Sequence, residues 1–179
     1  FVLDMNWHQK PAWTGYTWDQ KMYPDHEALL SFLHNDRGLY VGANLHDAQG
    51  IMPTENEYKA MANYLKQSDG KTLTFHVSNK SYADGLNKFV LEPLAANGGF
   101  DFWWTDWQQG LQGMPGVGTT DVAGLNPTMW LNHYRTMNYT QPNSTRRPQI
   151  HSRFGGLGGH RYTSQFGGDV VQDWDSLLA

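Results

Sequence analysis

The residues best suited to chemistry lie in a tryptophan-rich segment, Trp103–Gly110, with the sequence WWTDWQQG. Its carboxylate, Asp106, follows an apolar run typical of a buried strand and is flanked by the indoles of Trp104 and Trp107. Indole rings offer large apolar faces on which the C–H faces of a sugar ring can stack, while sugar hydroxyls need carboxylate or amide partners. The pattern fits a sugar site, but it equally fits a tryptophan-rich core strand followed by a surface aspartate.

A second cluster combines cationic, aromatic and glycine residues and ends in a carboxylate. It runs from Ser152 to Tyr162 and continues in Phe166–Asp169, with the sequence FGGD. Glycines before Asp169 would let the backbone approach a ligand closely. However, the stretch GLGGHR lacks the last glycine of the dinucleotide-binding fingerprint, and the cluster holds no Lys–Ser or Lys–Thr pair for a phosphate-binding loop. A phosphate-binding enzyme is therefore disfavoured, and the pattern alone favours a surface loop with Asp169 starting a helix.

The sequence gives little support for a metal site or for a Ser-His-Asp catalytic triad. The chain has eight histidines, but none forms the His-Glu-x-x-His spacing of zinc enzymes, and no Gly-x-Ser-x-Gly elbow is present. Four scattered histidines are expected to serve as hydrogen-bonded structural residues: His46, His133, His151 and His160. We therefore predict no metal site and no cofactor.

Composition narrows the possible partners. Lys and Arg number 13 against 17 Asp and Glu, giving a net charge of −4, so we expect no basic face for nucleic acid. No apolar run approaches the roughly 20 residues of a membrane helix. There are no cysteines, which excludes disulfides and thiolate chemistry. Three glycosylation sequons, at Asn79, Asn138 and Asn143, give slight weight to secretion and leave the compartment otherwise open.

The length of 179 residues corresponds to about one domain. The chain opens at Phe1 without an initiator methionine, and its last residues, from Trp174 onward, resemble the start of a helix. We therefore expect a piece of a larger protein.

Strands and helices are predicted to alternate. Strands are expected over residues 1–7, 39–45, 72–77, 100–105 and 149–151, with a short sixth segment over 165–170. Helices are expected from the cap Asp25 to Gly38, over 55–66, 83–96 and 127–137, and after the cap Asp173. The strands are apolar on both faces, which indicates parallel strands covered by helices.

The positions of the polar residues distinguish two parallel architectures. A doubly wound sheet usually carries a glycine loop after its first strand, but residues 4–7 contain no glycine. A (β/α)8 TIM barrel places chemistry at the C-terminal ends of several strands, where this chain has Asp4, the stretch from Asn44 to Asp47, Asp106, Arg153 and Asp169. We therefore predict an incomplete α/β barrel with about six of eight strands, forming one partial catalytic domain over residues 1–179.

Taken together, these segments resemble glycoside hydrolase family 31, the family of α-glucosidases, α-xylosidases and related retaining α-glycosidases and transglycosidases. The sequence WWTDWQQG resembles the nucleophile segment of that family, and residues 152–169 resemble its acid/base segment. Two earlier segments also match the family pattern in the same order: LDMNW at residues 3–7 and YPD at residues 23–25. The resemblance covers nearly the whole chain, as the middle of the catalytic barrel.

The resemblance implies an α-glucosidase-like hydrolase that cleaves terminal α-linked sugars of an oligosaccharide or α-glycoside by double displacement. Asp106 would be the nucleophile, and Asp169 would be the general acid/base, partly buried beside it. Asp4 and Arg153 would hold hydroxyls of the sugar. The substrate-binding residues implied are Asp4, Asn44, Trp104, Trp107, Arg153 and Phe166.

Two positions depart from the common family pattern. Gln109 stands where many members have an acidic residue, and Phe166 stands where many have tryptophan. These departures leave the accepted sugar open. Two other functions also stay open: a catalytically inactive, carbohydrate-binding relative that keeps the aromatic cleft, and a transglycosidase that transfers the glycosyl group to an acceptor sugar.

Overall fold

A parallel β-sheet forms the centre of the protein. The computed structural model describes residues 1–10, 13–67, 69–106, 122–138, 147–153, 157–162, 164–165 and 167–178. Five strands follow one another across the sheet in chain order: β1 (Val2–Leu3), β2 (Gly42–Leu45), β3 (Phe102–Thr105), β4 (Ile150–Ser152) and β5 (Ser164–Gln165). Every neighbouring pair is parallel. The sheet does not close on itself, and this order is that of consecutive barrel strands.

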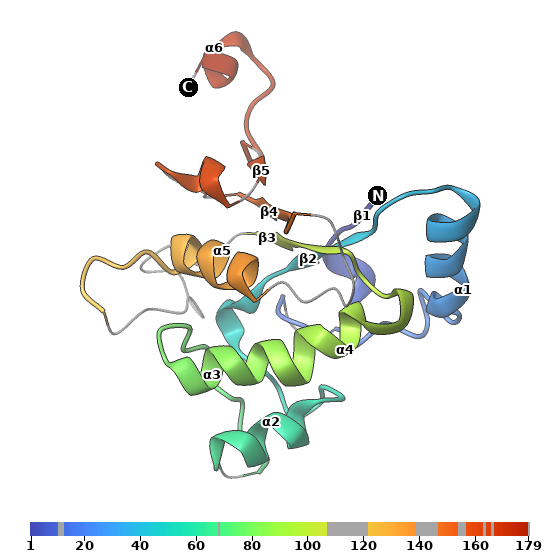
Figure 1. Ribbon diagram of the computed structural model, residues 1–179, viewed down its shortest axis with the longest axis vertical. Helices are drawn as coiled ribbons and strands as arrows, with labels where there is room; N and C mark the ends of the chain where they lie inside the picture. Colours follow the sequence, from blue (N-terminus) through green and yellow to red (C-terminus); the bar gives the residue numbers. More distant parts are fainter. Residues whose placement is uncertain are drawn as a thin grey trace.

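Helices connect the strands (Figure 1). They are α1 (His26–Ser31) continued by η2 (Phe32–Asp36), α2 (Tyr58–Leu65), the consecutive segments α3 (Lys80–Gly85), η4 (Leu86–Leu91) and α4 (Glu92–Ala95), then α5 (Pro127–Met137) and α6 (Trp174–Leu178). Short 3-10 turns are η1 (Met5–Trp7), η3 (Asp47–Gln49), η5 (Ala96–Gly98) and η6 (Gly159–Arg161). Among the helices of the described ranges, none combines the length and hydropathy that a bilayer crossing requires.

Alternation along the strands divides the sheet into two faces. Ala43 and Leu45 of β2 and Trp103 of β3 belong to the hydrophobic core formed with the helices. The residues before and after these three along each strand point to the opposite face, because successive side chains of a strand alternate between the two faces of the sheet. That opposite face receives the polar residues, so the sheet separates a helix-covered core from a functional face.

The core also anchors the start of the chain. Trp7 is fully buried, and its ring lies edge-on to Trp18 and Phe100 with centroids 5.2 Å and 5.1 Å apart. Trp18 stacks on Phe100 at an interplanar angle of 16°. Since Phe100 immediately precedes β3, this aromatic cluster fixes the segment after β1 against the third strand of the sheet.

Several predicted helices form where local signals placed them. The Asp25 side chain accepts a hydrogen bond from the Ala28 amide at 2.9 Å and begins α1. Helix α5 spans residues 127–137 as predicted; Asn126 caps it through the Thr128 and Met129 amides, and proline occupies its first turn.

The predicted strand over residues 72–77 is wrong. The segment makes an isolated antiparallel bridge between Leu73 and Ile51 and does not join the sheet. Leu73, Phe75 and Val77 are nonetheless buried in alternation, because an extended segment can press one side into the core without a neighbouring strand. The sheet of the described residues therefore has five strands, one fewer than predicted. The first strand is also shorter, since Asp4 caps the 3-10 turn η1.

Candidate active site

Five predicted site residues share the face of the sheet opposite the helices. On β2 and β3, Asn44 pairs in register with Trp104, and Asp106 follows two residues after Trp104. Asp4 follows β1 by one residue, and Arg153 follows β4 by one residue. Because all four strands are parallel, their C-terminal ends meet at one edge, where a barrel places its chemistry. The fold therefore brings together side chains that lie up to 149 positions apart, from Asp4 to Arg153.

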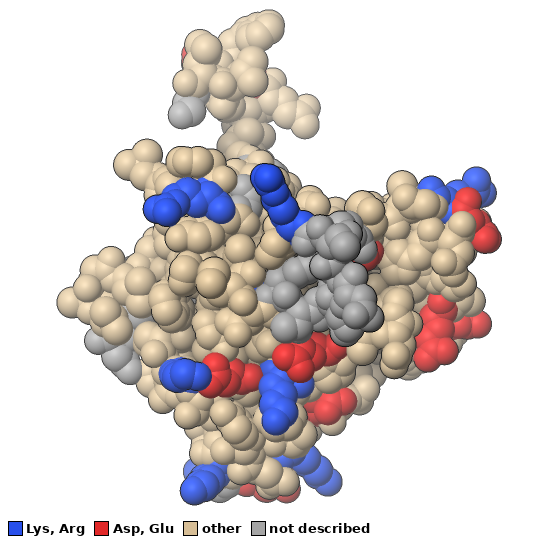
Figure 2. All heavy atoms as spheres, viewed as in Figure 1, with Lys and Arg blue, Asp and Glu red and all other residues tan. Residues whose placement is uncertain are grey.

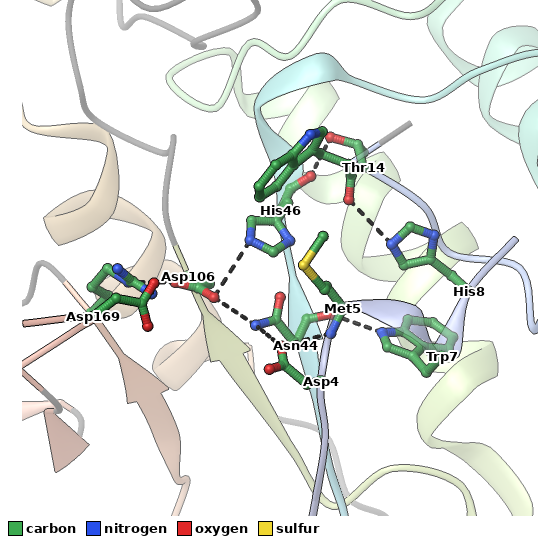
Figure 3. Close-up of polar contacts among 11 residues, drawn as sticks. Asp4, Met5, Trp7, His8, Thr14, Asn44, His46, Asp106 and Asp169 are labelled. Atoms are coloured by element: carbon green, nitrogen blue, oxygen red, sulfur yellow. Dashed lines mark hydrogen bonds and ion pairs between the residues drawn. The ribbon is translucent and has the colours of Figure 1, made fainter. Parts of the chain in front are cut away.

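Asp106 is the centre of this cluster (Figure 3). It is buried, with a side-chain exposure of 5%. Its Oδ2 accepts a hydrogen bond from Asn44 Nδ2 at 2.6 Å, and its Oδ1 accepts one from Arg153 Nε at 2.7 Å. Its backbone amide donates to the Leu45 carbonyl at 3.2 Å. The carboxylate is thus fixed from two sides by donors on neighbouring strands.

Asn44 joins two carboxylates through one amide nitrogen. Its Nδ2 donates to Asp106 and also to Asp4 Oδ1 at 3.0 Å. The backbone carbonyl of Asn44 accepts from the buried indole Nε1 of Trp7 at 2.8 Å. Because only the amide nitrogen carries hydrogens, the two carboxylates settle which way the Asn44 amide faces.

Arg153 links the two predicted catalytic carboxylates. While its Nε donates to Asp106, its Nη2 donates to Asp169 Oδ2 at 3.0 Å. The guanidinium is nearly buried, whereas the side chain of Asp169 is 84% exposed. The expected partial burial of Asp169 is therefore wrong, because its side chain is largely exposed beside the arginine.

The surroundings of Asp106 favour its ionised form. Burial alone would raise the pKa of Asp106, but the polar contacts from His46 and Asn44 and the positive charge of Arg153 outweigh it. The net effect holds the pKa of this carboxyl below its ordinary value. A buried carboxylate that stays ionised can act as a nucleophile at neutral pH.

A comparison with known families identifies the family of the chain. The sequence matches the family described as the glycosyl hydrolases family 31 TIM-barrel domain over residues 1–179. The chain belongs to glycosyl hydrolase family 31. The predicted resemblance and the incomplete TIM-barrel fold are thereby confirmed, and membership supports glycoside hydrolase chemistry on a carbohydrate substrate. A search of curated proteins found no match to this chain.

The candidate site contains one residue that the sequence analysis assigned to a structural role, His46. Its Nε2 lies 3.4 Å from Asp106 Oδ2, and its side chain is 1% exposed. Neither ring nitrogen makes a hydrogen bond to any described residue. The sequence held one usable signal: His46 follows Asn44 by two residues, so a strand through both places them on one face.

A buried ion pair supports the candidate site from the helix side. Arg135 of α5 donates from Nη2 to Asp47 Oδ1 at 2.7 Å and from Nη1 to Thr105 Oγ1 at 2.7 Å. Tyr16 donates to the same Asp47 oxygen at 2.8 Å. Arg135 and Asp47 have side-chain exposures of 2% and 0%. Thr105 and Asp47 immediately flank the residues of the site, so this pair locks the ends of β2 and β3 together.

The aromatic part of the predicted site is described only in part. Trp104 is half-buried, and its ring meets His151 edge-on with centroids 5.5 Å apart. Gly42 of β2 pairs in register with Phe102 and has no room for a side chain, since a Cβ there would lie 2.3 Å from the Phe102 ring. Trp107 and Phe166 lie outside the described residues.

The described residues contain no cluster of three or more His, Asp or Glu side chains that could hold a metal ion. Acidic and basic side chains are interspersed on the face drawn in Figure 2. The chemistry available to the described site is therefore that of carboxylates, a guanidinium, an amide and an imidazole.

Replacing Asn44 by leucine should move the acid limb of the pH profile of kcat/KM to higher pH. Leucine has nearly the same size but removes the donor to Asp106, so the pKa of Asp106 rises. In the folded protein the pKa of Asp106 lies below its ordinary value of about 3.9. Ionised Asp106 therefore stabilises the folded state above that pH, and this stabilisation is lost as the pH falls through the pKa of the folded state.

This pH prediction has a matched control and a clear contrary outcome. Asn35→Leu replaces an exposed asparagine whose side chain donates to Ser31, and it should leave the profile unchanged. An acid limb that stays in place in the Asn44→Leu variant would show that the amide does not control the ionisation of Asp106. Both profiles are measured in the natural protein that carries this sequence.

Proposed function

We propose that this family 31 chain carries the catalytic site of a retaining, α-glucosidase-like hydrolase that cleaves terminal α-linked sugars. One observation carries the proposal: a single guanidinium, that of Arg153, holds both Asp106 and Asp169. Retaining glycosidases need two carboxyl groups about 5–5.5 Å apart, one ionised and one able to donate a proton. A shared arginine is a direct way to keep such a pair together.

In the first step, a carboxylate oxygen of Asp106 attacks the anomeric carbon, and the bond to the leaving-group oxygen breaks. Asp169, in its protonated form, gives its proton to that oxygen, so the aglycone leaves as a neutral alcohol. The products of this step are a glycosyl ester on Asp106 and an ionised Asp169. The donors and the positive charge around Asp106 outweigh its burial, so they keep the nucleophile ionised and oriented before the attack.

In the second step, Asp169 takes a proton from a water molecule, which attacks the anomeric carbon from the face that the aglycone has left. The ester bond to Asp106 breaks, and the sugar is released with the anomeric configuration of the substrate. The exposure of Asp169 suits this role, since both aglycone and water must reach it from solvent.

The remaining residues bind the sugar. Asp4 and Arg153 hold hydroxyls by charge-assisted hydrogen bonds, and the half-buried Trp104 offers an apolar ring surface. Asn44 keeps Asp4 and Asp106 at a fixed separation by donating to both. Trp107 and Phe166 complete the proposed lining.

A trapping experiment tests the proposed mechanism. The natural protein is incubated with a 5-fluoro-α-glucosyl fluoride, whose 5-fluorine slows both steps while the good leaving group preserves the first. A retaining enzyme should accumulate a glycosyl adduct, and peptide mass spectrometry should locate it on Asp106. NMR of an aryl α-glucoside reaction should show the α-anomer of the sugar as the first product.

Each other result points elsewhere. If the β-anomer forms first, or if the adduct lies on another residue, the proposed retaining mechanism at Asp106 is wrong. Sugar binding without turnover of any aryl α-glycoside would identify an inactive carbohydrate-binding relative. Transfer to an added acceptor sugar in place of hydrolysis would identify a transglycosidase, which uses the same first step.

A further inference from the structure

Two buried polar side chains beside the proposed nucleophile have atoms that make no hydrogen bond to a described residue. They are Asn44 Oδ1 and both ring nitrogens of His46. Asn44 is 1% exposed and His46 is 3% exposed. The two residues are two positions apart at the end of β2, and Figure 3 shows their side chains next to each other on the same side of Asp106.

Such atoms are costly to leave unpaired. A buried donor or acceptor without a hydrogen bond loses its contact with water and gains nothing in return, and most native proteins avoid this. The orientation of the Asn44 amide is settled by the two carboxylates that accept from its nitrogen, so its oxygen faces away from them. The unpaired acceptor is therefore a property of the fold and not an exchange of the amide nitrogen and oxygen.

The ring of His46 is held without the use of its nitrogens. The Thr14 hydroxyl donates to the His46 backbone carbonyl. The Trp13 ring packs edge-on against the imidazole, with centroids 5.4 Å apart and an interplanar angle of 90°. Backbone and packing thus fix the side chain. Nε2 lies within ion-pair distance of Asp106, at 3.4 Å, but neither ring nitrogen makes a hydrogen bond to a described residue.

We propose that His46 and Asn44 together bind the 2-hydroxyl of the sugar in the cleavage subsite, which makes His46 a specificity-determining residue. A hydroxyl both donates and accepts a hydrogen bond. It can donate to Asn44 Oδ1 and accept from an N–H of the neutral imidazole, which satisfies an unpaired atom on each residue. This inference rests on the proposed function, because it needs a sugar bound against Asp106.

The position of His46 selects this hydroxyl among those of the sugar. The anomeric carbon must lie against the Asp106 carboxylate for attack, and His46 Nε2 is 3.4 Å from that carboxylate. A side chain this close to the carboxylate is also close to the two neighbours of the anomeric carbon, which are the ring oxygen and carbon 2. The ring oxygen has no hydrogen to donate to Asn44, whereas the 2-hydroxyl fits both residues. Hydrogen bonds to the 2-hydroxyl also strengthen in the transition state of glycosidases.

The test compares two substrates on two proteins. The kcat/KM values of an aryl α-glycoside and its 2-deoxy counterpart, with the same leaving group, are measured for the wild-type natural protein and for the His46→Phe variant. Phenylalanine keeps an aromatic ring against Trp13 but has no nitrogen. The ratio of the two substrates in the variant, divided by the ratio in the wild type, cancels the different intrinsic reactivity of the 2-deoxy sugar.

We expect the wild type to favour the 2-hydroxy substrate by at least about 100-fold more than the variant does. His46→Gln, which restores an N–H donor, should recover part of this discrimination. A ratio that is the same in wild type and His46→Phe would overturn the inference, as would a wild type that loses more from a 3-deoxy than from a 2-deoxy substrate. This second comparison needs no variant, so it holds even if His46→Phe does not fold.

The control separates this result from general damage and from failure of the proposed function. His26→Phe makes the same change on α1, where the ring stacks on Trp18 with centroids 4.7 Å apart, and it should leave the substrate ratio unchanged. If the wild type turns over no α-glycoside, the proposed function fails. If it turns over the parent substrate but the ratio does not respond to His46, the function stands and only the role of His46 is wrong.

Discussion

Replacing Asp106 by asparagine should abolish turnover of an aryl α-glycoside, with a loss of kcat/KM of about 10⁴-fold or more. Asparagine has the same size and can still occupy the site between Asn44 and Arg153, but its neutral amide is a poor nucleophile toward the anomeric carbon. Among the described residues, no other carboxylate contacts both Asn44 and Arg153, so none can take over the position of Asp106. Initial rates in the natural protein measure the effect.

Azide distinguishes the two carboxylates. In an Asp169→Ala variant, azide can attack the glycosyl ester without a general base, so it should restore turnover of an activated substrate and give the α-glycosyl azide. Azide should rescue Asp106→Asn less, because no glycosyl ester forms in that variant. Asp36→Asn, an exposed aspartate at the end of η2, serves as the control and should keep full activity. Substantial turnover by Asp106→Asn would rule out its role as nucleophile.

Replacing Arg135 by leucine should destabilise the protein by about 3–5 kcal/mol. The substitution leaves the fully buried Asp47 with its charge and without its cation, and it removes the donor to Thr105. Thermal and denaturant unfolding of the natural protein, followed by circular dichroism, measure the loss. Because Asp47 and Thr105 hold the ends of β2 and β3, activity should fall at temperatures where the wild type is still fully active.

A double variant shows whether the unpaired charge causes this loss. Adding Asp47→Leu to Arg135→Leu removes the buried carboxylate as well, and a buried ion pair replaced by apolar groups often costs little stability. The double variant should therefore be more stable than Arg135→Leu alone. If the single variant unfolds at the wild-type midpoint, the ion pair does not support the strand ends in the way the geometry indicates.

Local signals made much of the fold predictable. Helix α5 begins and ends where predicted because a capping asparagine, Asn126, and a proline in the first turn mark its start. The strand that leads into Asp106 was recognisable from its apolar run, and Arg153 from its place at the end of another. In a parallel sheet the strand ends meet at one edge, so strand assignment alone was enough to bring these side chains together.

Features that depend on tertiary contacts were not predictable in the same way. Residues 72–77 alternate like a strand, and only the absence of a neighbouring strand in the fold distinguishes them. His46 contacts Asp106 across 60 positions of sequence, and no motif marks that contact. The exposure of Asp169 depends on what covers it, which its own sequence neighbours do not specify.

The side chains held together by Asn44 and Arg153 give the candidate site an excess of negative charge. Within the described cluster, the carboxylates of Asp4, Asp106 and Asp169 outnumber the one guanidinium that neutralises them. Such a field disfavours sugar acids and sugar phosphates, and it attracts ligands whose ring carries a protonated nitrogen. It also lowers the energy of the positively charged, oxocarbenium-like sugar that forms as the glycosidic bond breaks. The same imbalance that screens out anionic sugars thus favours the reaction of neutral ones.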